Sequence, residues 1–395
     1  MRQLTLMRSP RSRRTAGTDP SPRFDAHPTL HGVPRIRVDE IVVGGDTLLS
    51  TTTRIGDREQ QGVFPIGDRA EFTSRTYGRI AGIRDHLAEI EDEIVRHFRA
   101  TQLLRKLGIQ LFRDLFDEAT REFLWKHRHA LEGLVLESSG ELDLPWELVH
   151  LEPFGDLADD HERHFLASYG LVRWVTEAAH PLEFHVRRGH VRALCPDYPG
   201  ELRLPSLTDE ASSLADSFRT RPVRHISPRR MTAAVRSDFD LLHFGGHGLW
   251  SPEPPIAEEL LLDRPAGRRG RAPVAVYTDA DLRRDLGRTR PRAGAAPMVV
   301  LNACDLGRIP SGRATPTGFA RTFLHWGAGA FIGCSWPVGD QPAAQFADAF
   351  YDGLVAQHLT IREAAMAARS AAKYADVSTL AYSVYAHPDA RILID

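Results

Sequence analysis

The chain has 395 residues, and its 50 Lys and Arg stand against 52 Asp and Glu, which gives a formal net charge of -2. This balance argues against a dedicated nucleic-acid-binding protein, and 42% hydrophobic with 26% charged residues is typical of a globular protein. At roughly 150 residues per domain, the length predicts two or three domains.

Residues 1–37 form an arginine-rich N-terminal segment. They hold eight arginines against Asp19 and Asp25, mixed with Pro, Ser and Gly. This composition predicts a disordered basic arm. A solvated tail is the preferred interpretation, and contact with nucleic acid or a membrane through the arm is the alternative.

Cysteine usage and hydropathy predict the compartment. Three cysteines, Cys195, Cys304 and Cys334, cannot build a disulfide framework and fit a reducing environment. No apolar run approaches the about eighteen residues that span a bilayer, and polar residues follow the Arg13-Arg14 pair where a signal peptide would be apolar. We expect a cytoplasmic protein without a membrane span.

The N-terminal half divides into two patterns. Residues 38–84 alternate apolar and polar residues with many glycines, which predicts a small region of strands and turns of unassigned role. Residues 85–183 begin with helical spacing, seen first in Leu87, Ile90, Ile94 and Phe98, and then in Leu103, Leu107, Leu111 and Leu115. We interpret both stripes as core-packing helix faces, with a ligand or partner helix as the alternative.

Strands and helices alternate over residues 184–395, which favours a parallel sheet covered by helices. The expected strands are 190–195, 223–226, 240–244, 298–302, 330–335 and 391–394. The expected helices are 207–219, 228–237, 279–286, 318–326, 341–357 and 360–374. The fold class is therefore α/β, with a six-stranded, mostly parallel sheet flanked by helices and preceded by a smaller helical or mixed subdomain.

Two strand ends carry residues suited to nucleophilic catalysis. One strand is followed by His247 and the other by Cys304. Loops gather at the carboxyl ends of parallel strands, and an imidazole beside a thiol favours the reactive thiolate. The pair is a candidate Cys–His dyad, with the N–H groups of Gly248 and Cys304 as oxyanion donors.

Simpler interpretations remain open from spacing alone. A cysteine that ends an apolar strand is commonly a buried small side chain, as we interpret Cys195 and Cys334. His243 and His247 have the helical spacing of metal ligands, but the two glycines between them argue against a helix and so against zinc. We expect no metal and no cofactor, and we interpret His243 as a packing or supporting residue.

A carboxylate follows a third strand. Asp340 comes five residues after Ser335, at the same edge of the sheet as Cys304. Capping of the following helix is one interpretation. The other is a pocket whose carboxylate pairs with a cationic substrate side chain.

With these residues in place, the chain resembles the CHAT family of caspase-like and separase-like cysteine peptidases, clan CD, over roughly residues 85–395. Seven elements in the family's order carry the resemblance: Leu144-Pro145-Trp146-Glu147-Leu148, Leu204-Pro205-Ser206-Leu207 with Glu210-Ala211, Leu242-His243-Phe244-Gly245-Gly246-His247-Gly248, Leu301-Asn302-Ala303-Cys304, Gly318-Phe319-Ala320-Arg321-Thr322-Phe323, Ser335-Trp336-Pro337-Val338, and the closing strand within 382–393. Ala386-His387 stands where the family usually has Gly-Asp.

The resemblance implies a role for each candidate site residue. Cys304 corresponds to the nucleophile, His247 to the proton-transfer partner, and Gly248 N–H to an oxyanion donor. Asp340 matches the acidic residue of the separase S1 pocket, which implies cleavage of a protein substrate after Arg or Lys. The family often has two acidic residues here, whereas this chain has Gly339-Asp340.

The resemblance also implies regulation. Relatives serve as effectors of bacterial defence and cell death, and the short N-terminal part of this chain predicts a latent protease that a partner protein activates. The Gly- and Arg-rich segment 264–271 is expected to be a solvated loop or a site of self-cleavage. The alternatives to a protease are a catalytically silent scaffold or signalling module and a nucleotide-binding domain. Gly327-Ala328-Gly329 precedes a strand, which is the wrong context for a phosphate loop.

Overall fold

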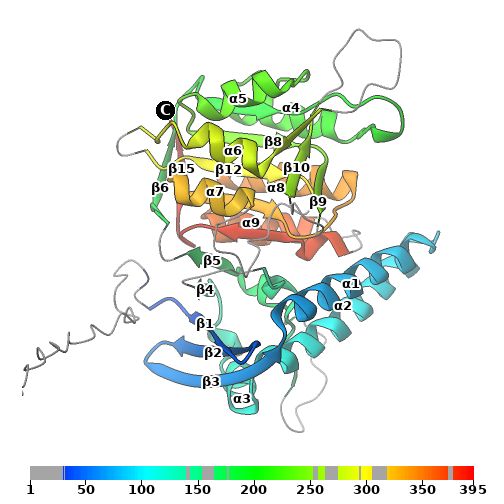
Figure 1. Cartoon of the computed structure of the whole chain (residues 1–395), viewed down its shortest axis with the longest axis vertical. Coiled ribbons are helices and arrows are strands. Elements are labelled where there is room, and N and C mark those ends of the chain that lie inside the picture. The colour runs from blue at the N-terminus through cyan, green and yellow to red at the C-terminus, as the bar shows by residue number, and fades with distance from the viewer. Residues whose placement is uncertain are drawn as a thin grey trace, which may run out of the picture. The chain divides into compact units, whose positions relative to one another are not determined.

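The structure is a computed structural model that describes residue 30 and residues 32–138, 143–153, 164–175, 178–251, 257–262, 275–292, 295–304, 318–371 and 377–395. Residues 1–32 and 33–395 are separate units, and the larger one contains every helix and strand named below (Figure 1). The expected basic arm falls almost entirely outside the described residues, and so does the segment 264–271.

Three strands and three helices open the larger unit. The antiparallel strands β1 (Arg35–Val43), β2 (Asp46–Ile55) and β3 (Arg58–Gly67) are followed by α1 (Arg69–Ala88), α2 (Glu93–Leu115) and α3 (Glu118–Lys126). Each helix begins after an aspartate, Asp68, Asp92 or Asp117, whose side chain accepts a backbone N–H of the first turn. These side chains satisfy donors that a helix start leaves open.

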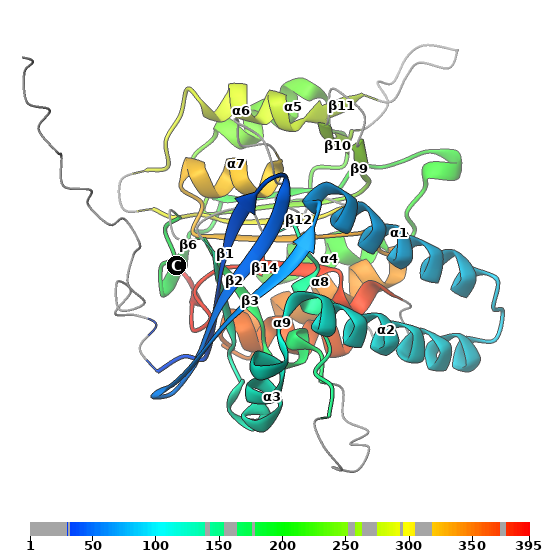
Figure 2. The ribbon, with the colours of Figure 1, turned by 60° about the horizontal axis from the view of Figure 1, so that its bottom comes forward.

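One of the two expected core stripes is wrong at Ile94 and Phe98, although its first residue, Leu87, is buried. Leu107, Leu111 and Leu115 are buried on α2, as predicted, but Ile94 is 78% and Phe98 is 60% exposed. The first stripe runs across the break between α1 and α2, so its residues share no helix face. Figures 1 and 2 show the paired helices α1 and α2 extending beyond the rest of the larger unit.

The central sheet has ten strands, not six. Its order is β3-β2-β1-β4-β5-β14-β13-β12-β8-β7. The strands not yet located are β4 (Val135–Ser138), β5 (Val172–Val175), β7 (Val191–Leu194), β8 (Leu241–Gly245), β12 (Met298–Asn302), β13 (Ala330–Cys334) and β14 (Tyr382–Tyr385). The sheet is mostly parallel beyond its first hairpins, and β14 runs antiparallel to β13. The expected α/β fold is confirmed, but the N-terminal strands extend the same sheet.

Two expected strands do not belong to the central sheet. Val223 makes a single bridge with Leu194, and the polar Arg224 and His225 that follow form no strand. The last strand, β15 (Arg391–Ile394), pairs with β6 (Glu183–Val186) in a separate two-stranded sheet. The strand that pairs with β13 is instead β14, which comes a few residues before β15 within the closing element 382–393.

Helices cover both faces of the part of the sheet that contains β8, β12 and β13 (Figure 2). One layer contains α5 (Pro228–Arg236), α6 (Asp279–Leu286) and α7 (Phe319–Trp326), whose apolar side chains join those of β8, β12 and β13 in one core. The other layer contains α4 (Leu207–Phe218), α8 (Asp340–Val355) and α9 (Ile361–Ala371), and α8 contacts both of the others. All six helices lie close to their predicted positions.

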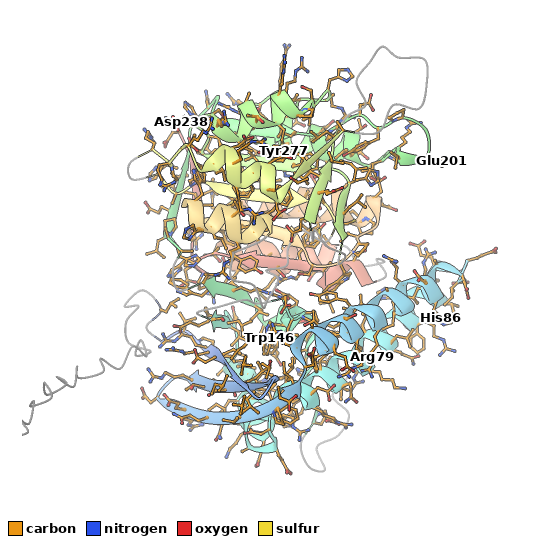
Figure 3. All side chains as sticks on the ribbon, in the orientation of Figure 1. Arg79, His86, Trp146, Glu201, Asp238 and Tyr277 are labelled. Atoms are coloured by element: carbon orange, nitrogen blue, oxygen red, sulfur yellow. The ribbon has the colours of Figure 1, made fainter. Side chains whose placement is uncertain are left out.

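Two smaller features complete the frame around the strand ends. The strands β9 (Gly248–Ser251), β10 (Ala257–Leu261) and β11 (Val276–Thr278) form an antiparallel sheet that begins directly after His247. The 3-10 helix η4 (Trp146–Leu148) lies in the Leu144–Leu148 motif, where Glu147 and Arg173 form a fully buried ion pair. Trp146 is buried beside this pair, whereas Arg79 and His86 lie on the exposed side of α1 (Figure 3).

No helix in the described ranges has both the length and the apolar character that crossing a bilayer requires.

Candidate active site

The structure brings His247, Cys304 and Asp340 to one cavity. β8 and β12 are adjacent parallel strands with Gly245 opposite Asn302, so the residues that follow them emerge at the same edge of the sheet. All three side chains line a cavity of about 80 Å³. A water molecule requires about 10–15 Å³, so the cavity has room for part of a substrate.

His247 is held by its backbone and by one ring nitrogen. Its Nε2 lies 2.8 Å from the carbonyl oxygen of Leu202, in the 3-10 helix η6 (Gly200–Leu202). A carbonyl accepts hydrogen bonds only, so Nε2 carries the proton and Nδ1 is the basic nitrogen. Orientation of an imidazole in this way fixes which nitrogen can take a proton from a nucleophile.

Tyr198 links the loop of His247 to the neighbouring strand. Its hydroxyl accepts the His247 N–H at 3.1 Å and donates to the Leu261 carbonyl at 2.7 Å. The rings of Tyr198 and His247 also pack, with centroids 4.7 Å apart. A Cβ on Gly246 would lie 2.5 Å from the Tyr198 hydroxyl, so this position requires glycine.

Cys304 is partly buried and lies opposite the segment after β13. The Val338 N–H donates to its Sγ at 3.5 Å. The Cys304 thiol in turn donates to the Val338 carbonyl oxygen at 3.9 Å, so the segment after β13 holds the sulfur in place.

The backbone register leaves Gly248 N–H available. Leu261 N–H donates to the His247 carbonyl at 3.0 Å. The next pair in the antiparallel ladder, Gly248 and Leu260, is then a non-hydrogen-bonded pair, because the two kinds alternate. The Gly248 N–H therefore points away from β10.

Asp340 has a structural contact that the sequence did not predict. It is the first residue of α8, after the N-cap Gly339, and its Oδ2 accepts the Ser206 N–H at 2.8 Å. Ser206 is the N-cap of α4, so Asp340 caps a neighbouring helix and not the helix that follows it. The carboxylate also lines the cavity.

The remaining histidine and cysteine candidates are buried. His243 bonds through Nε2 to Glu210 Oε1 at 2.6 Å and through Nδ1 to the Tyr351 hydroxyl at 2.8 Å. Both ring nitrogens of His243 therefore have side-chain partners within the protein. Cys334 is buried and also lines the cavity. Cys195 is buried as well, and its burial raises the pKa of its thiol.

Sequence reasoning missed Glu210 and Tyr198 as parts of this site. Glu210 shares one face of α4 with the buried Leu207, Ala211 and Leu214. An acidic residue on an apolar helix face requires a buried partner, and this pattern was visible in the sequence.

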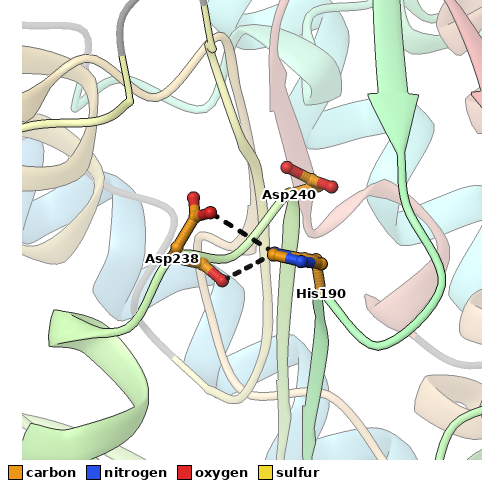
Figure 4. Close-up of side chains that lie close together, drawn as sticks. All are labelled: His190, Asp238 and Asp240. Atoms are coloured by element: carbon orange, nitrogen blue, oxygen red, sulfur yellow. Dashed lines mark hydrogen bonds and ion pairs between the residues drawn. The ribbon is translucent and has the colours of Figure 1, made fainter.

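A group of potential metal ligands lies away from the cavity. His190, Asp238 and Asp240 place ligand-type atoms within 4.8 Å of one another (Figure 4). Arg187 donates to both Asp240 oxygens, at 2.8 and 2.9 Å, and to Asp238 at 3.1 Å. Burial alone would raise the pKa of Asp240, but the bonds from Arg187 outweigh it and lower that pKa. A guanidinium therefore already balances these carboxylates.

Comparison with models of known families shows which family the chain belongs to. The model of the CHAT domain matches residues 103–388, which is most of the chain. The chain belongs to the CHAT domain family. The resemblance drawn from the seven sequence elements is thereby confirmed. A search of curated proteins finds no match to this CHAT protein.

Solved structures show the same fold. Two crystal structures of the Saccharomyces cerevisiae separase–securin complex match with a TM-score of 0.50, at 13% and 12% identity, and the matches cover 91% and 93% of this chain. The CHAT protein spans only 30% and 31% of those chains. The Arg-specific cysteine proteinase gingipain R matches with a TM-score of 0.45 at 11% identity, over 78% of this chain and 76% of its own. The match to the separase structures shows that the CHAT protein has a separase-like fold.

Proposed function

We propose that this CHAT protein is a cysteine endopeptidase that cleaves protein substrates after Arg or Lys. The observation that carries the proposal is that the pair His247 and Cys304 and the separately chosen carboxylate Asp340 line one cavity. A nucleophile, a base and an anionic side-chain pocket are the parts that such a reaction needs.

The chemistry follows from the two strand ends. His247 takes the proton from the Cys304 thiol through Nδ1, and the sulfur attacks the carbonyl carbon of the scissile bond. The N–H groups of Gly248 and Cys304 stabilise the oxyanion of the tetrahedral intermediate. His247 returns the proton to the leaving amine, and water then hydrolyses the thioester and restores the thiol.

Asp340 gives the pocket its preference for a cationic side chain. A guanidinium bonds a carboxylate with two parallel N–H donors, and an ammonium pairs with it as a point charge. Arginine is therefore the favoured P1 residue and lysine the second. The bond between Asp340 and Ser206 orients the carboxylate at the cavity wall.

The biological role that we propose is a latent cytoplasmic effector of a bacterial defence or cell-death system. It rests on membership of the CHAT family and on the expectation that a partner protein activates the protease. The separase structures contain the partner securin, and control by a bound protein is proposed here by analogy.

Cleavage of fluorogenic peptides varied at P1 tests the activity. Wild type is compared with Cys304→Ala and Asp340→Asn, with and without lysate of the source organism to supply an activator. Asn keeps an oxygen that can accept the Ser206 N–H, so Asp340→Asn removes the charge and preserves the cap. Asp352→Asn, an exposed carboxylate on the same helix, is the matched control.

The expected result is release from Arg and Lys peptides by wild type and Asp352→Asn, none by Cys304→Ala, and loss of the Arg preference in Asp340→Asn. Activity that survives in Cys304→Ala would contradict the proposed nucleophile. Absence of cleavage in every arm, together with a Cys304 that is alkylated equally fast in wild type and His247→Ala, would favour the scaffold or signalling alternative.

A further inference from the structure

Glu210 is a buried carboxylate at the cavity that the steps above do not use. It is 3% exposed and belongs to α4, one turn after the Ser206 cap. A carboxylate in such a place needs strong hydrogen bonds to offset its lost hydration. The identity of its partners therefore indicates what it does.

Glu210 bonds to both strands that carry the proposed dyad. Its Oε1 lies 2.6 Å from His243 Nε2 on β8 and accepts from Asn302 Nδ2 on β12 at 2.9 Å. His243 stands four residues before His247, and Asn302 stands two residues before Cys304. One oxygen atom thus joins the two strand ends directly beneath the proposed catalytic side chains.

Further hydrogen bonds complete the network. The Asn302 side chain also donates to the Ala343 carbonyl at 3.0 Å and accepts from the Tyr382 hydroxyl at 2.6 Å. Its backbone carbonyl accepts the Gly246 N–H at 3.1 Å, which connects it to the residue before His247. Every part of the Asn302 side chain is therefore fixed by neighbours on α4, α8 and β14.

Close packing sets the position of the carboxylate. A Cβ on Gly245 would lie 2.6 Å from Glu210 Oε1 and 2.7 Å from Leu207 Cδ1. The strand can approach the carboxylate this closely only because residue 245 is glycine. A side chain shorter by one methylene would withdraw the oxygen from both partners.

We propose that Glu210 is a positioning residue that sets the separation of His247 and Cys304 by accepting hydrogen bonds from His243 and Asn302. This inference rests on the proposed peptidase function and deepens it. Glu210 acts through the reach of Oε1 and not through its charge. The competing explanation is that Glu210 is a second anionic group for the P1 side chain, because it also lines the cavity.

Two substitutions separate reach from charge. Glu210→Gln keeps an oxygen at the same distance from the backbone, and that oxygen can still accept both bonds, but it removes the charge. Glu210→Asp keeps the charge and shortens the side chain. Positioning predicts that activity follows wild type, Gln, Asp and Ala in decreasing order, whereas a P1-binding charge predicts that Asp outperforms Gln.

The experiment measures kcat and KM on an Arg-P1 peptide for these variants, with Asp209→Asn as the control, an exposed carboxylate on the same helix. A misplacement of about 1 Å can cost about 100-fold in rate, so kcat should fall by roughly that factor in Glu210→Asp and Glu210→Ala. It should stay within about fivefold of wild type in Glu210→Gln, with KM within about threefold in all. The second-order rate of Cys304 alkylation by iodoacetamide should follow the same order, and circular dichroism verifies folding.

The outcomes separate the inference from the function on which it rests. Three results would overturn the positioning role while leaving the proposed peptidase activity intact. They are an equal kcat in wild type and Glu210→Asp, a raised KM with unchanged kcat in the variants, and a higher kcat in Glu210→Asp than in Glu210→Gln. If Glu210→Ala does not fold, the Gln and Asp variants alone decide the order. If wild type cleaves nothing, alkylation of Cys304 still decides. Positioning is supported if Cys304 is alkylated faster in wild type than in His247→Ala and if this rate drops in Glu210→Asp. An equal alkylation rate in wild type and His247→Ala would overturn the dyad itself.

Discussion

Because His150 is buried, we predict that the protein loses unfolding free energy in mild acid. The side chain is 1% exposed, and burial lowers its pKa from the ordinary 6.5 to about 4. Its Nδ1 lies 2.6 Å from the Leu151 carbonyl, and its Nε2 accepts the His164 N–H at 3.3 Å. This pair of contacts suits the neutral ring, because Nε2 must remain without a proton.

The sign and size follow from linkage between protonation and folding. The unfolded chain binds a proton near pH 6.5 and the folded chain only near pH 4, so the stability contributed by the neutral ring is present above pH 6.5 and is lost as the pH falls through that window. At about 1.36 kcal/mol per pH unit, the full window corresponds to about 3 kcal/mol. About 2 kcal/mol of this should be lost between pH 7 and pH 5.

Urea unfolding at pH 7 and pH 5 measures this loss. Wild type should lose about 2 kcal/mol more unfolding free energy over this interval than His150→Gln, which has no titrating ring. His129→Gln, which changes an exposed histidine, should behave as wild type does. The other titrating groups cancel in the comparison. Equal losses in wild type and His150→Gln would refute the reasoning.

Three further substitutions test packing and charge. Gly246→Ala should lower kcat at least about tenfold, because the new Cβ displaces the Tyr198 hydroxyl that holds His247, and a kcat equal to wild type would contradict this. Arg173→Met should cost about 3–5 kcal/mol in urea unfolding, because it leaves the buried Glu147 carboxylate unpaired; adding Glu147→Gln should restore part of that loss. Phe98→Ser should change stability by less than about 0.5 kcal/mol, because the ring is 60% exposed, and a larger loss would show that the ring is packed.

The sequence predicted the parts of the fold whose signals are local. β8, β12 and β13 are continuous apolar runs, and α4 to α9 have clear amphipathic spacing, so their positions agree with the structure. Pairing between distant segments has no such signal. β1 and β4 are adjacent in the sheet, yet the chain between Val43 and Val135 forms two more strands and three helices before it returns, and the sheet was therefore predicted too small.

The site divides in the same way. His247 and Cys304 could be paired because each follows a recognisable strand, but their proximity depended on the two strands being neighbours, as β8 and β12 are in the structure. Asp340 could be assigned to the same edge, but its bond to Ser206 depends on the packing of α8 against α4. Contacts of this kind follow from tertiary structure and leave no fixed spacing in the sequence.

The ten-stranded sheet has a seam between β5 and β14. Their ladder is a single residue pair, Arg173 with Tyr385, whereas neighbouring ladders contain four pairs. Side chains span the seam instead: Arg369 donates to the Tyr382 carbonyl at 2.8 Å and to the Ala167 carbonyl at 3.3 Å. The strands on the two sides of this seam are thus joined by one backbone residue pair together with hydrogen bonds from the buried Arg369 guanidinium. A force or partner that separates the two sides would have to break these guanidinium hydrogen bonds, whereas the neighbouring ladders would remain intact.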